Sequence, residues 1–300
     1  MRPRLFEIHL PFLHWTLPVN SYGTMMVIGF LIGVYLACRR AKRMGIDPNL
    51  MTDVGMIAII SGILGARIFF VIEYYKDFSG NWIEAIRIDK GGLVFYGGFF
   101  AAVVCVSYYV WRKKQSMADI LDISTPSLAV GLAFTRIGCF LNGCCWGKVC
   151  SAALPWAVYF PQNSGTFKQQ IEDKLLSGAA MHSLPVHPTQ IYESLAAFGL
   201  FFVTTWLFRY RKRKGDILAA FAVLYSVARF LIECLRADNE YQFDGLTMSQ
   251  NIGILVFILG IAWLVWGKLT GGLPAAVPTG VAKTNGQRSR GAEEQRRKEC

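Results

Sequence analysis

Long apolar stretches follow one another along the chain, and each comes close to the roughly 20 residues that a helix needs to cross a bilayer. Their apolar residues form continuous runs and do not alternate with polar residues, which favours helices over strands. The pattern therefore predicts seven transmembrane helices, over residues 21–38, 54–72, 92–111, 120–140, 189–208, 216–235 and 248–266.

The segments around these stretches are more polar. Residues 1–20 have apolar positions interrupted by prolines, which predicts a segment in the membrane interface. The longest connection, 148–188, predicts a small external cap with one short helix at 167–176. Residues 271–300 are rich in glycine, proline and charged residues and predict a disordered cytoplasmic tail. The expected fold is an all-α integral membrane protein with one transmembrane domain over 21–270.

Composition agrees with this prediction. Hydrophobic residues make up 53% of the chain and the mean hydropathy is +0.36, which excludes an ordinary soluble domain. The net charge of +11 comes from short basic runs between the apolar stretches, a pattern typical of membrane-flanking loops and not of nucleic-acid binding. The loops of one side carry 19 lysines and arginines and those of the other side 9. The positive-inside rule then predicts an external N-terminus and an internal C-terminus.

The helical rise of 1.5 Å per residue gives the depth of each polar side chain within its predicted span. By this measure the polar side chains lie near the outer ends of the spans. An arginine in hydrocarbon costs roughly 2.5–3.5 kcal/mol on insertion scales, so each one suggests a function. The residues that share this depth are Tyr22, Arg67, Tyr96, Arg136, His187, Glu193, Tyr225, Arg229 and Glu233. Their convergence predicts one polar site in the outer half of the membrane.

The chemistry of this set points to an anion. Arg67, Arg136 and Arg229 carry the planar guanidinium fork that suits phosphate, and a phosphate at this depth belongs to a phospholipid headgroup. The available proton donors and acceptors are Tyr96, His187, Glu193, Tyr225 and Glu233.

Structural explanations exist for several of these residues. Arg229 and Glu233 are four residues apart and form a packing pair in the simplest interpretation. Gly97 and Gly98 suit close helix packing as well as close approach of a ligand. The cysteines lack paired metal-binding spacing, so the sequence predicts no metal and no cofactor.

Six short stretches, in order, carry a family resemblance: SYGTMMVIGF, GARIFFVIE, GGLVFYGG, RIGCFLNGCCWG, HPTQIYE and LYSVARFLIECLR. From Ser21 to Met248 the chain resembles the phosphatidylglycerol–prolipoprotein diacylglyceryl transferase family. The resemblance implies a multi-pass protein of the bacterial cytoplasmic (inner) membrane with its site facing outside. It also implies transfer of diacylglyceryl from phosphatidylglycerol to the lipobox cysteine thiol of exported prolipoproteins. The product is a thioether, and glycerol phosphate leaves.

The resemblance also assigns residues. Arg136 and Arg229 correspond to the arginines of the family's motifs, and the other matched positions are Tyr22, Asn142, Gly147, Tyr225 and Glu233. Three positions depart from the family, with Tyr96 at its usual histidine, Cys139 at its usual asparagine and Cys144 at its usual glutamate.

The base that accepts the thiol proton therefore stays open. Unperturbed tyrosine has a pKa of about 10, whereas histidine titrates near neutrality. The candidates are Tyr96, His187, Glu193 and Glu233, and the alternative is that the thiol arrives as a thiolate. The motif cysteines stand where the family has non-thiol residues, so they are not expected to be covalent nucleophiles.

Two other functions remain open at this point. One is a transporter or receptor with an anion or phospholipid site and no covalent chemistry. The other is a diverged family member with another acceptor, because of Tyr96, Cys139 and Cys144. Formation of a lipidated peptide would separate the transferase from both.

Overall fold

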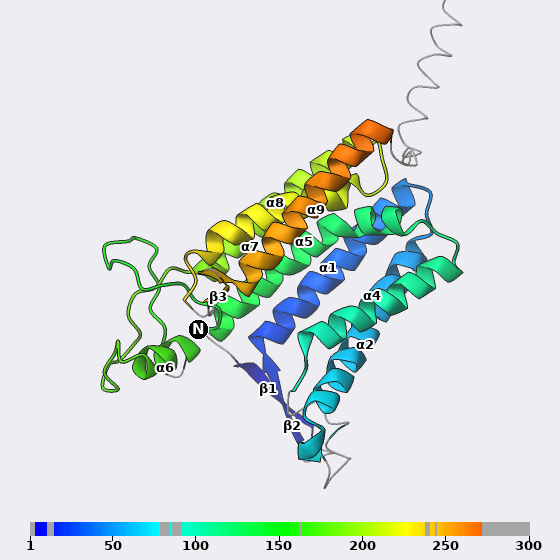
Figure 1. The fold of residues 1–300 in the computed structure, drawn as a ribbon. Helices are drawn as coiled ribbons and strands as arrows, with labels where there is room; N and C mark the ends of the chain where they lie inside the picture. Colours follow the sequence, from blue (N-terminus) through cyan, green and yellow to red (C-terminus); the bar gives the residue numbers. More distant parts are fainter. Residues whose placement is uncertain are drawn as a thin grey trace, which may run out of the picture. The chain divides into compact units, whose positions relative to one another are not determined.

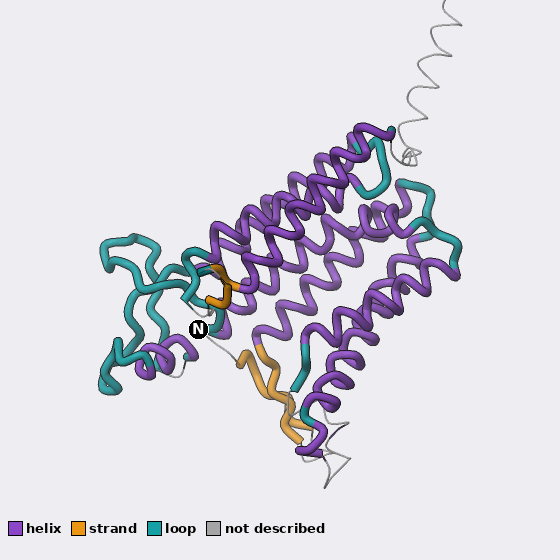
Figure 2. The backbone as a smooth tube through the Cα atoms, in the orientation of Figure 1, coloured by secondary structure: helices purple, strands orange, loops and turns teal. Residues whose placement is uncertain are grey.

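The computed structural model describes residues 4–10, 15–78, 85, 92–162, 164–237, 241–243 and 245–271. This part of the chain contains eight α-helices and two short two-stranded antiparallel hairpins (Figure 1, Figure 2). The chain forms two compact units. The described residues of the first unit fall within 1–35 and 124–275, and those of the second within 36–123.

The first unit is a bundle of long helices. The hairpin of β1 (Arg4–Leu10) and β2 (Trp15–Asn20) leads directly into α1 (Ser21–Arg43). The other long helices are α5 (Met117–Asn142), α7 (Thr189–Leu207), α8 (Asp216–Glu233) and α9 (Met248–Thr270). The last residues of α1, from 36 on, and the first of α5, up to 123, belong to the second unit. A short 3₁₀ turn, η2 (Phe208–Tyr210), ends α7.

Small residues bring the helices of the first unit together. A Cβ added at Gly29 of α1 would lie 2.8 Å from Phe134 Cβ of α5, and one at Gly138 of α5 would lie 3.2 Å from Tyr22 Cα. Helix α8 packs against both α7 and α9. These contacts place the ends of α5, α7 and α8 around one region, where the polar residues described below meet.

Loops and short elements gather at one end of this bundle (Figure 2). They comprise residues 143–188 with α6 (Gly165–Glu172), and the hairpin of β3 (Tyr241–Phe243) and β4 (Leu246–Thr247). Phe160 and Val186 are fully buried, so the loop has a small core of its own. The short helix predicted at 167–176 begins at Gly165, because the Ser164 hydroxyl caps it by accepting from the Phe167 amide.

The second unit is built on α2 (Pro48–Glu73) and α4 (Phe95–Arg112), with the 3₁₀ turn η1 (Tyr75–Phe78) between them in sequence. The two helices are in close contact through glycines. A Cβ at Gly98 would lie 2.6 Å from the Gly62 oxygen, and one at Gly65 would lie 2.3 Å from Ala101 Cβ. Such small-residue contacts are common between membrane helices.

The helical membrane class is confirmed. Five of the described helices are long and apolar enough to cross a membrane: α1, α2, α5, α7 with η2, and α9. The other two predicted spans, α4 and α8, are helices of 18 residues, and α8 carries three charged residues. The count of seven therefore stays a prediction, as does the fate of residues 272–300, which lie outside the described residues.

Candidate functional site

Glu193, one turn into α7, is the centre of a buried ionic cluster. Its side chain is 5% exposed. Oε1 accepts hydrogen bonds from Arg229 Nη1 at 2.6 Å and from Arg236 Nη1 at 3.1 Å. Oε2 lies 2.6 Å from Arg136 Nε. One carboxylate therefore joins guanidiniums from the end of α5, from α8 and from the residues just after α8.

A second carboxylate completes the cluster. Glu233 Oε2 lies 2.8 Å from Arg229 Nη2 and 3.9 Å from Arg236 Nε. Glu233 Oε1 accepts a hydrogen bond from Thr247 Oγ1 at 2.8 Å. Thr247 also caps α9 through a capping box with Gln250, so the start of α9 is fixed to the cluster.

The cluster carries a positive balance. Three guanidiniums, Arg136, Arg229 and Arg236, face two carboxylates, Glu193 and Glu233. The formal charge is therefore +1 when all five are ionised. Exposed fractions of the five side chains range from 0% to 16%, so water screens these charges little. A buried positive site built from guanidinium forks is suited to an anion such as phosphate.

The structure brings together four residues that the sequence placed at one depth: Arg136, Glu193, Arg229 and Glu233. Sequence reasoning missed Arg236, which it assigned to an external loop. The signal was present, because Arg236 follows Arg229 by seven residues and Glu233 by three and thus continues the same helical face.

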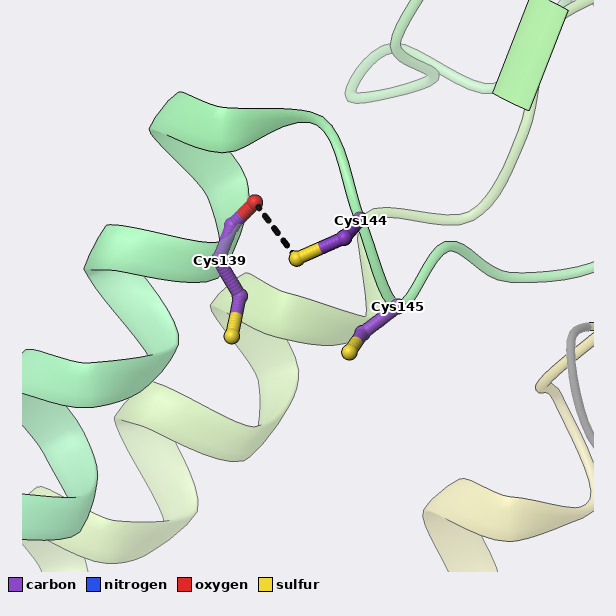
Figure 3. A group of neighbouring side chains, drawn as sticks. All are labelled: Cys139, Cys144 and Cys145. Atoms are coloured by element: carbon purple, nitrogen blue, oxygen red, sulfur yellow. Dashed lines mark hydrogen bonds between the residues drawn. The ribbon is translucent and has the colours of Figure 1, made fainter. Parts of the chain in front are cut away.

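A group of three thiols lies beside this cluster. The Sγ atoms of Cys139, Cys144 and Cys145 all lie within 4.8 Å of one another. Figure 3 shows the Cys144 and Cys145 side chains reaching from the turn after α5 back toward Cys139. The Cys144 thiol lies 3.7 Å from the Cys139 carbonyl oxygen, a weak hydrogen bond.

The backbone forces this arrangement. Gly143 and Cys145 have positive φ values of 74° and 60°, which turn the chain back on the end of α5. Side chains at the start of α7 hold the turn in place. Gln190 Nε2 donates to the Cys144 carbonyl at 2.7 Å, and Thr189 Oγ1 donates to the Cys145 carbonyl at 3.0 Å.

The thiols differ in acidity. The pKa of Cys145 is lowered, because the thiols of Cys139 and Cys144 hydrogen-bond to it and the charges of Arg236 and Arg136 favour its thiolate. Burial raises the pKa of Cys150. Cys145 and Cys150 are both free thiols, so they form no disulfide with each other in this structure.

Other predicted residues surround the cluster in the first unit. Gly147 donates its N–H to the His187 carbonyl at 3.1 Å, and a Cβ there would lie 2.6 Å from that oxygen. His187 Nδ1 is 3.3 Å from the Tyr192 hydroxyl. Asn142 is exposed at the end of α5. The Tyr22 phenol of α1 lies within electrostatic range of Arg136 and of the three thiols described above.

A small cavity adjoins the cluster. It measures ≈ 10 Å³ and is lined by Glu193, Arg229 and Tyr225, whose ring stacks on Phe221. That volume is about the space of one water. A phosphate therefore enters only if the Glu193 contacts open.

Arg67, Tyr96, Gly97 and Gly98 belong to the second unit. Arg67 donates from Nε to the Ala85 carbonyl at 2.8 Å and from Nη1 to the Gly92 carbonyl at 3.0 Å. Tyr96 is 53% exposed, and its ring lies edge to face against Phe95. The predicted approach of these four residues to Arg136 and Arg229 stays a prediction.

Apolar helices of membrane length and a buried cluster of three arginines and two glutamates define an integral membrane protein with a buried, positively charged site. The model of the family described as prolipoprotein diacylglyceryl transferase matches residues 11–266. The chain belongs to the prolipoprotein diacylglyceryl transferase family.

Relatives named phosphatidylglycerol–prolipoprotein diacylglyceryl transferase extend over most of the chain. The protein of Clostridium tetani is 32% identical over 261 residues, which cover 87% of this chain and 96% of that protein. The protein of Ralstonia pickettii is 30% identical over 269 residues (83% and 90%), and that of Burkholderia thailandensis 29% over 282 residues (87% and 94%).

Proposed function

We propose that this chain transfers the diacylglyceryl group of phosphatidylglycerol to the lipobox cysteine thiol of exported prolipoproteins. The reaction forms a thioether and releases glycerol phosphate. The observation that carries the proposal is the set of three guanidiniums around Glu193 in a chain of this family. Guanidiniums that bind the donor phosphate also stabilise the negative charge that develops on it as it leaves.

In this proposal Glu193 holds the arginines in place before the lipid arrives. Without it, three like charges in a buried site would repel one another. The donor phosphate then replaces some of the carboxylate contacts of Arg136 and Arg229, whose forks can each offer two parallel N–H groups. The phosphodiester carries one negative charge, so its binding changes the formal charge of the site from +1 to 0, which favours binding of the anion.

An apolar groove offers a place for an acyl chain. It measures ≈ 240 Å³ and lies between α8 and α9, with Val227, Phe230, Ile254 and Phe257 in its wall. In this proposal an acyl chain of the donor lipid lies in this groove, while the phosphate meets Arg229 of the same helix.

Tyr96 takes the place of the family's usual histidine in this proposal. A neutral phenol both donates and accepts hydrogen bonds, so it can orient the glyceryl oxygens or relay the thiol proton. The carboxylates of Glu193 and Glu233 are already in contact with arginines. His187, beside Tyr192, is the other candidate acceptor.

The orientation follows the asymmetry of basic residues. In a seven-span arrangement the N-terminus and the loop region 143–188 are outside and the C-terminus is inside. The ionic cluster lies at the loop end of its helices, so it faces the side where exported precursors emerge. The protein then acts in the bacterial cytoplasmic membrane.

The test is a transfer assay with the full chain in vesicles. Phosphatidylglycerol and a lipobox peptide are added, and mass spectrometry scores the peptide for a diacylglyceryl thioether. A peptide with serine in place of the lipobox cysteine, and vesicles with phosphatidylethanolamine as the donor, serve as controls. Binding of phosphatidylglycerol without a lipidated product would favour a transporter or receptor and contradict the proposal.

A further inference from the structure

The three thiols of Cys139, Cys144 and Cys145 form a set of soft ligands that the arginine–glutamate cluster does not use. They come from two places, the last turns of α5 and the turn that follows it. Among the described residues this is a group of three, without a fourth histidine, cysteine or carboxylate. Thiolates in this number select soft or borderline metals such as zinc.

The spacing of the sulfurs suits one metal ion. Zinc binds thiolates at about 2.3 Å in a tetrahedral arrangement, which places two bound sulfurs about 3.8 Å apart. The sulfurs here are within 4.8 Å of one another. Side-chain rotations that move the sulfurs about 1 Å closer together therefore bring all three onto one zinc ion. The backbone, which Gln190 and Thr189 hold in place, need not change.

The surrounding charges also suit a zinc–thiolate group. Zinc with three thiolates carries a formal charge of −1. The charges of Arg136 and Arg236 act on Cys145, and the neighbouring ionic cluster has a formal charge of +1. The positive charges of these two arginines therefore favour an anionic zinc–thiolate group.

A three-ligand site leaves one position of the metal open. Cys139 is buried, at 5% exposure, whereas Cys144 and Cys145 are half-buried in the turn after α5. Two of the three ligands are thus partly accessible at the loop end of the bundle, where an acceptor can approach the metal. Zinc sites with three protein ligands and one open position are typical of catalysis, while structural sites are closed.

We propose that Cys139, Cys144 and Cys145 bind a zinc ion whose open position takes the lipobox thiol of the acceptor as a thiolate. This inference rests on the proposed transferase function for the identity of the thiol. Tyr96, at the family's histidine position, is not a base that titrates near neutral pH. Zinc takes over the activation of the acceptor, because it lowers the pKa of a thiol that binds to it.

The balanced step is a substitution at carbon. When the acceptor thiol binds zinc, its proton leaves to water. The thiolate sulfur then attacks the glyceryl carbon of phosphatidylglycerol. A C–S bond forms and the C–O bond to phosphate breaks, with its electron pair leaving on glycerol phosphate beside Arg136 and Arg229. No atom is oxidised or reduced, and zinc is retained. The sequence predicted no metal, so this proposal revises that expectation.

The first test uses the metal alone. The full chain is purified in detergent under reducing conditions, incubated with zinc chloride and dialysed, and zinc is measured by mass spectrometry. We expect close to one zinc per chain for the parent protein and for Cys150→Ser, which removes a free thiol outside the group. We expect a loss of bound zinc in Cys139→Ser, Cys144→Ser and Cys145→Ser. Zinc retained in all three, or absent from the parent, would overturn the site.

The second test asks whether the open position takes a thiol. Cobalt(II) replaces zinc, and its thiolate charge-transfer absorption is recorded while a lipobox peptide is added. We expect the absorption to rise with the cysteine peptide and not with the serine peptide, and not in Cys144→Ser. An unchanged spectrum with both peptides would overturn the proposed role of the metal.

These readouts do not need phosphatidylglycerol, so they separate the two proposals. A spectral response to the peptide with no lipidated product would leave the metal site standing and overturn the transferase. A lipidated product formed at the parent rate by zinc-free protein would do the reverse. A disulfide between two of the three cysteines in protein purified without reductant, together with no zinc uptake once the thiols are reduced, would also overturn the metal site.

Discussion

Glu193 contacts three charged side chains. It lies against Arg136, Arg229 and Arg236 and is nearly excluded from solvent. Desolvating a carboxylate costs free energy, which its contacts with the three arginines offset. If Glu193 is neutralised, all three arginines lose the negative charge that balances theirs. Its contribution to stability and its contribution to function therefore come from the same contacts.

The substitution Glu193→Gln is expected to destabilise the protein strongly. Arg136, Arg229 and Arg236 would each lose a carboxylate contact, and breaking a buried pair costs about 3–5 kcal/mol. The free energy of unfolding in detergent measures the effect. Glu172→Gln, at the exposed end of α6, is the matched control and should stay within about 0.5 kcal/mol of the parent. Equal stability of the two variants would contradict the central role of Glu193.

Tyr96 is expected to act in the reaction through its hydroxyl. Tyr96→Phe keeps the ring and its contact with Phe95, so the fold should be unaffected. The transfer rate should fall by about 10²–10⁴-fold, the usual cost of losing a positioned acid–base group. Tyr108→Phe, an exposed position of the same helix, is the control. Parent-like rates for both variants would leave Tyr96 a packing residue.

Some site residues could be predicted and others could not. Charged residues inside an apolar stretch can be recognised from the sequence, because burying a charge in the membrane is costly. This applies to Arg136, Glu193, Arg229 and Glu233. Arg236 lies just past α8, where an arginine is ordinary, so only the helical spacing connects it to Arg229. The three thiols meet because the backbone turns back at Gly143 and Cys145. The spacing of the cysteines in the sequence does not show this turn.

At the scale of helices, the sequence predicts where a membrane crossing lies better than where a helix ends. Helix α1 begins at Ser21 as predicted but continues through Arg43, because helical structure does not stop where the apolar run stops. Helix α2 begins at Pro48, six residues before the predicted span, since Asp47 caps it and proline is favoured in the first turn. The hairpin of β1 and β2 was not predicted, because prolines interrupt its pattern.

The contact between α2 and α4 is expected to depend on Gly98. A Cβ there would lie 2.6 Å from a backbone oxygen of α2, which cannot move away as a flexible side chain would. Gly98→Ala should therefore cost about 1–3 kcal/mol of stability. Gly199→Ala in α7 is the control, because a Cβ there meets no atom within 4 Å. Thermal unfolding in detergent compares them, and equal midpoints would contradict the tight contact.

For the whole molecule, function depends on which side of the membrane the loop region 143–188 occupies. Exported precursors and their lipobox thiols are available only outside. The helices themselves do not set this orientation; the distribution of lysine and arginine does. The sequence thus predicts the topology by a rule that the arrangement of helices alone does not test.

Reporter fusions test this topology. A fusion after Lys114 should report the cytoplasmic side and one within 164–168 the external side, because the basic runs stay inside. Alkaline phosphatase and a fluorescent protein serve as paired reporters, since they are active on opposite sides. The reversed pattern would place the ionic cluster on the wrong side for exported substrates.

The central claim is that the guanidinium forks of Arg136 and Arg229 bind the donor phosphate during transfer. The most direct measurement is the initial rate of thioether formation for Arg136→Lys and Arg229→Lys, with Arg112→Lys, at the exposed end of α4, as the control. Lysine keeps the charge but loses the two-pronged contact. The two site variants should insert at parent levels and lose about 10²–10³-fold in rate, the cost of removing one positioned donor, while the control keeps the parent rate. Parent rates in both site variants would contradict the account.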